Sequence, residues 1–289
     1  MARSLRLVTA RGYRVRRGLD GRGTFGGVTR TAASRTLPPM PRIADRRPRR
    51  PRLVAVALAL GLVAGVAIPA AAAPPPLPAC HVGDTLTAHR RLADWHRSIL
   101  DLDFRLSSTY APSDLRSTAD AGLNGGYKVR KHVLSDLRAM AAAARKAGAR
   151  LAVQSAYRSY ATQKSTFDYW VRVHGYEVAL TESARAGHSE HQLGTTLDFR
   201  SYGGPAPWDL KDWATTKAGA WMKANAWKYG FVMAYPKGKT AVTCYAYEPW
   251  HYRYVGRERA ALVRASGLTL RQYLWLEQHQ PGKLMVTRP

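Results

Sequence analysis

The amino-acid sequence predicts an α+β fold, built as a single mixed domain. Apolar residues recur at helical spacing in several segments, short apolar segments lie between them, and no internal repeat is visible. The chain has 289 residues, of which 46% are hydrophobic, so it can bury the core of one or two domains. Helices mixed with short strands that do not alternate strictly are typical of the α+β class.

The predicted helices follow apolar residues at a period near 3.6. Leu86, Leu92 and Trp95 have this spacing in the first helix, and an Ala-rich stretch ending at Gly148 marks the clearest one. In chain order we predict helices over residues 85–100, 129–147, 163–174, 213–228 and 257–266.

The predicted strands are all short. The first follows directly on the Ala-rich helix, two others begin at or just after a glycine, and the last two carry alternating tyrosines. We expect these strands at residues 151–156, 195–199, 230–234, 245–247 and 252–255.

The segment at residues 40–73 is typical of a secretory signal peptide. Five arginines between residues 46 and 52 precede an uncharged apolar run at 53–68 and a small-residue tail, with cleavage expected near Ala72 or Ala73. The alternative is an uncleaved membrane anchor at 53–73, which is long enough to span a bilayer. Either way, the rest of the chain is expected outside the cell or on the cell-wall side of the membrane.

The remaining chain divides by composition. Residues 1–39 are rich in Arg, Gly, Ser and Thr without an apolar period, so we expect them to be disordered or, if translation starts at Met40 rather than Met1, not translated. Residues 74–84 are expected to form a proline-rich linker, and residues 85–289 the folded domain.

The chain is strongly basic, with 45 Lys and Arg against 19 Asp and Glu and a formal charge of +26. Such a charge suits nucleic acid, an anionic membrane or an acidic polymer equally well. Because export argues against nucleic acid, we expect anionic cell-wall polymers as possible partners. We expect a monomer.

The sequence contains two cysteines, Cys80 and Cys244. Export would place both in an oxidising compartment, where a disulfide between them is expected.

Candidate metal ligands occur in the segment S-E-H-Q-L-G-T-T-L-D. His191 and Asp198 lie on either side of Gly194, which permits a tight turn into a strand. One imidazole and one carboxylate on the same rim suit zinc, although this spacing alone is a weak signal.

The segment E-P-W-H offers the rest of a catalytic zinc site. His251 is a candidate third ligand, and Glu248 lies three residues earlier, where it can move protons without binding the metal. Taken alone, the segment fits a solvated glutamate beside ordinary core aromatics equally well.

A third segment, S-A-Y-R-S-Y-A-T-Q, lies at the predicted junction between a strand and a helix. Arg158 there can polarise a scissile carbonyl or hold a substrate carboxylate, because its planar fork suits both. A surface arginine at a capped helix start is the competing interpretation.

Together, the three segments resemble the VanY-like D-alanyl-D-alanine carboxypeptidases, a zinc peptidase family with the hedgehog/D,D-peptidase fold. The motifs S-x-Y-R-S-x-x-x-Q, S-x-H-x-x-G-x-x-x-D and E-P-W-H occur in the family's order. The resemblance implies a small antiparallel sheet with flanking helices and a single zinc ion. It implies these roles: His191, Asp198 and His251 as ligands, Glu248 as general base and acid, Arg158 as oxyanion stabiliser, and Gln163, Ser189 and Arg158 as substrate contacts.

We therefore expect a zinc-dependent D,D-carboxypeptidase that removes the terminal D-alanine from peptidoglycan stem peptides. Alternatives on the same fold are an L,D-carboxypeptidase, a D,D-dipeptidase and a peptidoglycan endopeptidase. A zinc-bearing cell-wall binding module is the alternative outside enzymes, and the retained Glu248 argues against it.

Overall fold

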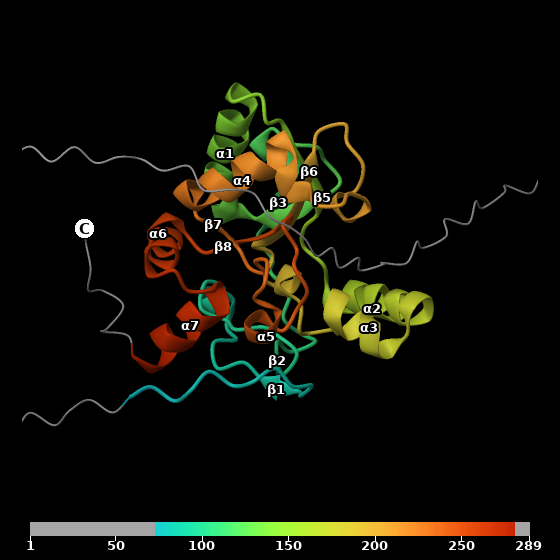
Figure 1. Ribbon diagram of the computed structural model, residues 1–289, viewed down its shortest axis with the longest axis vertical. Helices are drawn as coiled ribbons and strands as arrows, with labels where there is room; N and C mark the ends of the chain where they lie inside the picture. The colour runs from blue at the N-terminus through green and yellow to red at the C-terminus, as the bar shows by residue number, and fades with distance from the viewer. Residues whose placement is uncertain (1–72, 281–289) are drawn as a thin grey trace, which may run out of the picture. The chain divides into compact units, whose positions relative to one another are not determined.

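A computed structural model describes residues 73–280 of the chain (Figure 1). The predicted disordered arm and nearly all of the predicted signal segment therefore lie outside the described residues. None of the helices within 73–280 is long and apolar enough to cross a membrane. The helices are α1 (Leu134–Lys146), α2 (Tyr160–His174), α3 (Tyr176–Glu182), α4 (Lys217–Asn225), α5 (Thr240–Thr243), α6 (Arg257–Ser266) and α7 (Leu270–His279). The strands are β1 (Thr85–Leu86), β2 (Phe104–Arg105), β3 (Leu115–Ser117), β4 (Lys128–Arg130), β5 (Leu151–Ser155), β6 (Thr196–Ser201), β7 (Phe231–Met233) and β8 (His251–Tyr254).

An antiparallel sheet organises the described residues, with its strands in the order β5-β6-β8-β7. Two further pairs of strands, β1 with β2 and β3 with β4, lie outside this sheet. The small antiparallel sheet with flanking helices agrees with the predicted fold class.

Strand alternation separates the core from the functional face of the sheet. In β6, Leu197 and Phe199 are fully buried in the main hydrophobic cluster, which also receives α1 and α4. Successive side chains of a strand point to opposite faces, so Asp198 points away from this core. The same alternation in β8 sends Tyr252 into the core and His251 to the face of Asp198.

Several predicted elements lie where the sequence indicated. Helix α6 has the predicted bounds, and α2, β5, β6, β7 and β8 lie within two or three residues of theirs. Helix α1 begins at Leu134 because the first residues of the predicted segment pair as β4. Its buried face consists of Leu137, Met140, Ala141 and Ala144, at the expected helical spacing.

The predicted helix at residues 85–100 is wrong. Thr85 and Leu86 instead pair with Phe104 and Arg105 as parallel strands, and the chain then makes a short 3₁₀ turn at Leu92–Asp94. Leu86 and Leu92 are exposed, so the apolar residues of the segment do not form one buried face.

Two other predicted elements also differ from the structure. The segment 213–228, predicted as one helix, instead forms α4 with a 3₁₀ turn before it and another after it. Helix α4 begins separately because the hydroxyl of Thr216 caps its first turn by accepting a hydrogen bond from the amide of Gly219. Residues 245–247 form no strand, because Cys244 has a left-handed backbone with φ of 71° and turns the chain. Helices α3, α5 and α7 were not predicted.

The proline-rich segment at 74–84 is held against the domain. Trp275 in α7 donates a 2.8 Å hydrogen bond to the carbonyl of Pro75, and Arg271 donates to the carbonyl of Pro78 at 3.1 Å. A disulfide joins Cys80 to Cys244, with Cα atoms 5.3 Å apart. The segment expected to be a proline-rich linker thus makes specific contacts with the folded domain.

Candidate active site

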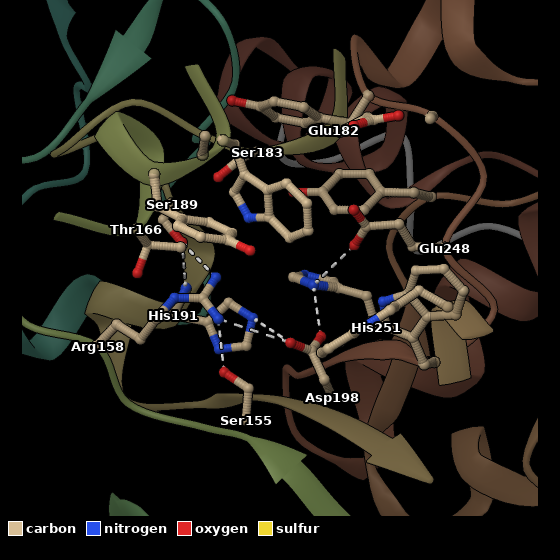
Figure 2. Close-up of a pocket in the computed structure, with 18 of the residues that line it drawn as sticks. Ser155, Arg158, Thr166, Glu182, Ser183, Ser189, His191, Asp198, Glu248 and His251 are labelled. Carbon is tan, nitrogen blue, oxygen red and sulfur yellow. Dashed lines mark hydrogen bonds and ion pairs between the residues drawn. The ribbon is translucent and has the colours of Figure 1, made fainter. Parts of the chain in front are cut away.

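A cavity of about 920 Å³ opens on the face of the sheet opposite α1 and α4. It is lined by Arg158, Ser189, His191, Asp198, Glu248 and His251, all of which were expected in the functional site (Figure 2). These side chains come from three segments far apart in sequence that the sheet brings together.

His191, Asp198 and His251 offer a group of potential metal ligands. Within residues 73–280, one ligand atom from each lies within 4.8 Å of the other two. The Oδ2 atom of Asp198 is 3.2 Å from Nε2 of His191, and its Oδ1 atom is 3.2 Å from Nδ1 of His251. The three residues predicted from two separate motifs therefore converge on one point.

The local chain path explains this convergence. His191 lies in a 3₁₀ turn, Glu190–Leu193, that ends at Gly194 with φ of 73°. A side chain there would also approach Arg130 at 2.9 Å, so glycine suits both the backbone and the space. Asp198 and His251 are direct cross-strand partners in β6 and β8.

The three candidate ligands fit a zinc ion in chemistry. Two imidazole nitrogens and one carboxylate oxygen are donors that catalytic zinc sites use. The Nε2 atom of His191 is buried without a hydrogen-bond partner among the described residues. Burial lowers the pKa of His191 to about 4, so its ring is neutral at pH 7. Its Nδ1 atom lies 2.7 Å from the carbonyl oxygen of Ala156 and therefore carries the hydrogen, which leaves the lone pair on Nε2.

Glu248 lies beside the candidate ligands. Its Oε2 atom is 3.4 Å from Nδ1 of His251, and its backbone amide donates to the carbonyl of Tyr235. Burial, together with the nearby carboxylates of Asp198 and Glu190, raises the pKa of Glu248 to about 7. A carboxylate with a pKa near neutrality is suited to accept and return a proton.

Arg158 lies on the opposite side of the cavity from Glu248, as Figure 2 shows. Its Nη1 atom is 3.6 Å from Oδ2 of Asp198, and its Nη2 atom is 3.5 Å from the hydroxyl of Ser189. Arg158 precedes α2, whose first turn is capped by Ser159. The guanidinium thus places a positive charge at the edge of the candidate metal site.

Gln163, which was expected to contact substrate, is instead fully buried and does not line the cavity. Its Oε1 atom accepts a 2.7 Å hydrogen bond from Nε of Arg158, and its Nε2 atom donates to the carbonyl of Ala184 at 2.6 Å. Its amide group is therefore used to orient the arginine.

Comparison with known proteins identifies the family. The family model VanY, D-alanyl-D-alanine carboxypeptidase, matches residues 126–257. YodJ of Bacillus subtilis, which is named a carboxypeptidase, is 37% identical over 61% of this chain and 66% of its own length. A D-alanyl-D-alanine carboxypeptidase of Enterococcus faecalis is 30% identical over 71% of this chain and 80% of its own length. The chain belongs to the VanY family.

Solved structures of the family share the fold. The LD-carboxypeptidase LdcB is 33% identical, with a TM-score of 0.57 over 65% of this chain and 93% of LdcB. A mutant of the vancomycin resistance D,D-pentapeptidase VanY, solved in complex with Zn(II), is 28% identical, with a TM-score of 0.54 over 62% of this chain and 99% of VanY. The match covers 35% of a D-alanyl-D-alanine carboxypeptidase of Enterococcus faecium, so this chain spans about one third of that relative.

Sequence reasoning missed a buried ion pair next to the candidate ligand cluster. Oε2 of Glu190 lies 3.0 Å from Nε2 of His251, and Oε1 accepts a 2.8 Å hydrogen bond from Arg253. Burial raises the pKa of Glu190, but Arg253 and His251 outweigh it and bring the pKa to about 2. For His251 the signs are reversed. Burial lowers the pKa of its imidazole, but hydrogen bonds to Asp198 and Glu190 outweigh burial and raise the pKa to about 10. The sequence signal for this ion pair was Arg253, which follows the candidate ligand His251 by two residues on a buried strand.

Aromatic side chains that the motifs did not indicate form other parts of the cavity wall. Tyr235 packs against His251 with ring centres 4.6 Å apart, and the hydroxyl of buried Tyr245 has no hydrogen-bond partner within residues 73–280. On another side, Trp208 and Trp250 meet edge to face at 6.1 Å. The cavity is thus larger and more aromatic than a pocket for a single alanine needs.

Proposed function

We propose that this chain is a zinc-dependent carboxypeptidase that releases the terminal D-alanine from peptides ending in D-Ala-D-Ala. The observation that carries the proposal is the convergence of His191, Asp198 and His251 beside Glu248 in one cavity. Membership of the VanY family supports the peptidase class, and the Zn(II) complex of VanY supports the metal. Peptidoglycan stem peptides are the proposed natural substrates.

The ligand set would hold one zinc ion through Nε2 of His191, a carboxylate oxygen of Asp198 and Nδ1 of His251. Zinc bound there supplies a Lewis acid that polarises a carbonyl group and lowers the pKa of a water molecule. Glu248 would accept a proton from the attacking water and return it to the amine of the departing D-alanine. Its proximity to His251 and its pKa near neutrality support that role.

Arg158 would bind negative charge on the substrate. Its Nη1 atom lies near the carboxylate of Asp198 and its Nη2 atom near the hydroxyl of Ser189, while its Nε atom donates a hydrogen bond to Gln163. A guanidinium in this place can stabilise the oxyanion that develops on the scissile carbonyl or hold the terminal carboxylate. Ser189 is a candidate for a further contact, because its hydroxyl lines the same wall.

The direct test is hydrolysis of a short peptide ending in D-Ala-D-Ala by the purified protein. We expect release of free D-alanine, loss of activity after chelation and recovery with added zinc. A protein that binds zinc but hydrolyses no such peptide would contradict the proposed reaction. A protein that binds no zinc would contradict the proposed metal site.

A second candidate is an L,D-carboxypeptidase, because LdcB has the same fold at 33% identity. The two reactions differ in the residue before the scissile bond, which is D-alanine in one and an L-residue in the other. Rates on two peptides that differ at this residue alone would decide between them.

We also propose that the protein is exported. The disulfide between Cys80 and Cys244 supports an oxidising compartment. Residues 40–73 fused to a reporter that is active only after export would test the signal, and an inactive reporter would argue against it.

A further inference from the structure

Each ring nitrogen of His251 faces a different carboxylate. Nδ1 lies 3.2 Å from Asp198 at the candidate metal site, and Nε2 lies 3.0 Å from Oε2 of Glu190 on the other side of the ring. Glu190 is buried and does not line the cavity. Substrate cannot reach its carboxylate, so any influence of Glu190 on the reaction must pass through His251.

Arg253 fixes the other oxygen of the same carboxylate. Its Nη1 atom donates to Oε1 of Glu190 at 2.8 Å, and its Nη2 atom donates to the carbonyl of Trp95 at 2.8 Å. Arg253 is fully buried and follows His251 by two residues in β8, so both side chains leave the strand on the same face. The carboxylate of Glu190 is therefore held between two donors.

The two imidazoles use opposite nitrogens. Nδ1 of His191 lies 2.7 Å from the carbonyl oxygen of Ala156, which leaves Nε2 for a metal. In His251 the nitrogen beside Glu190 is Nε2, which leaves Nδ1. A carboxylate only accepts hydrogen bonds, so Nε2, which faces Glu190 away from the candidate metal site, must carry a hydrogen. Nδ1 faces Asp198, itself a candidate ligand, and a zinc ion bound by both would take the place of any hydrogen between them. Partners of this kind set the orientation and the basicity of metal-binding histidines.

We propose that Glu190, oriented by Arg253, is a positioning residue that keeps the hydrogen of His251 on Nε2 and so presents Nδ1 to zinc. This inference rests on the zinc site of the proposed function. It adds Glu190 and Arg253, which no motif indicated, to the residues that determine metal affinity.

Glu190→Gln tests the proposal because it keeps size and shape but replaces one acceptor oxygen by an NH2 donor. If that donor faces His251, the ring must move its hydrogen to Nδ1, the nitrogen that zinc needs. If the donor faces Arg253, two donors oppose each other and the side chain turns away. In either orientation, we expect zinc affinity to fall by about 10- to 100-fold.

Asp101→Asn is the matched control. Asp101 is also a buried carboxylate paired with an arginine, at 2.7 Å from Nε of Arg271, but it contacts none of the candidate ligands. We expect Asp101→Asn to lower thermal stability while zinc affinity, measured by competition with a chelating dye, stays at the wild-type value. Arg253→Met, which leaves Glu190 without its cation, is expected to weaken zinc binding as well.

The outcomes separate this inference from the proposed function. Wild-type protein that binds no zinc contradicts the metal site itself. Wild-type protein that binds zinc while folded Glu190→Gln or Arg253→Met binds it equally well overturns the inference. If neither variant folds, nitrogen-15 NMR of zinc-loaded wild-type protein decides: we expect a hydrogen on Nε2 of His251 and the metal on Nδ1, and the reverse arrangement overturns the proposal.

Discussion

The guanidinium of Arg158 is anchored by Gln163, which is fully buried and accepts a 2.7 Å hydrogen bond from the Nε atom of Arg158. We therefore expect Gln163 to act through Arg158 and not by contact with substrate. Arg158→Lys should lower kcat/KM by about ten- to a hundredfold, because it loses a charge-assisted, oriented contact. Gln163→Leu should cause a smaller loss of the same kind.

The double variant Arg158→Lys, Gln163→Leu distinguishes the two roles. If Gln163 only orients Arg158, the double variant should be no less active than Arg158→Lys alone. Losses that multiply would show that Gln163 makes a contact of its own.

Glu248→Gln should separate proton transfer from metal binding. The variant keeps the shape of the side chain and leaves the candidate ligands in place, so we expect wild-type zinc content and folding. Turnover should fall by about 10²- to 10⁴-fold, the usual contribution of a general acid or base. Exposed Glu258, in the first turn of α6, provides a charge-matched control as Glu258→Gln. A Glu248→Gln enzyme with a tenth of wild-type activity would rule out this role.

A carboxypeptidase should require the free carboxylate at the end of its substrate. We expect peptides ending in D-Ala-D-Ala to be cleaved about ten- to a hundredfold faster than the same peptides with an amidated end, because amidation removes one charge-assisted contact with the enzyme. The measurement is release of D-alanine or its amide under identical conditions. Equal rates would indicate an endopeptidase on the same fold.

Reduction of the disulfide should destabilise the domain. Cys80 and Cys244 are 164 residues apart, and closing a loop of that size contributes at most about 5 kcal/mol to the free energy of unfolding. Denaturant unfolding with and without reductant measures the difference. In a Cys80→Ser background, Cys244→Gly should be more stable than Cys244→Ser, because φ at this position is 71°. No change on reduction would contradict the expected contribution.

The sequence predicted the candidate ligands because each motif is local and because the three motifs together resemble the VanY family. His191 and Asp198 are linked by a glycine turn, and Glu248 and His251 lie in one short segment, so spacing alone limits where they can lie. Glu190 and Arg253 are 63 residues apart, and their ion pair depends on the register of β6 and β8. The local pattern shows an arginine two residues after His251, but it does not show which carboxylate pairs with that arginine.

The helix wrongly predicted at 85–100 has a similar explanation. Its apolar residues have helical spacing, but the backbone of Thr85 and Leu86 finds partners in Phe104 and Arg105, which the spacing does not reveal. Pairing between distant segments outweighed local preference. The helix at 257–266 has the predicted bounds, and a glycine lies at each of its ends in the structure.

Asp198 and His251 face each other on the two interior strands of the sheet, each of which has a neighbour on both sides. Interior strands lie at the slow end of native-state hydrogen exchange, because local fraying does not expose their amides. Zinc bound at the proposed site would therefore be able to leave through the cavity while β6 and β8 stay closed. Metal exchange and unfolding then become separate events, and amide protection in β6 and β8 should persist in protein from which zinc has been removed.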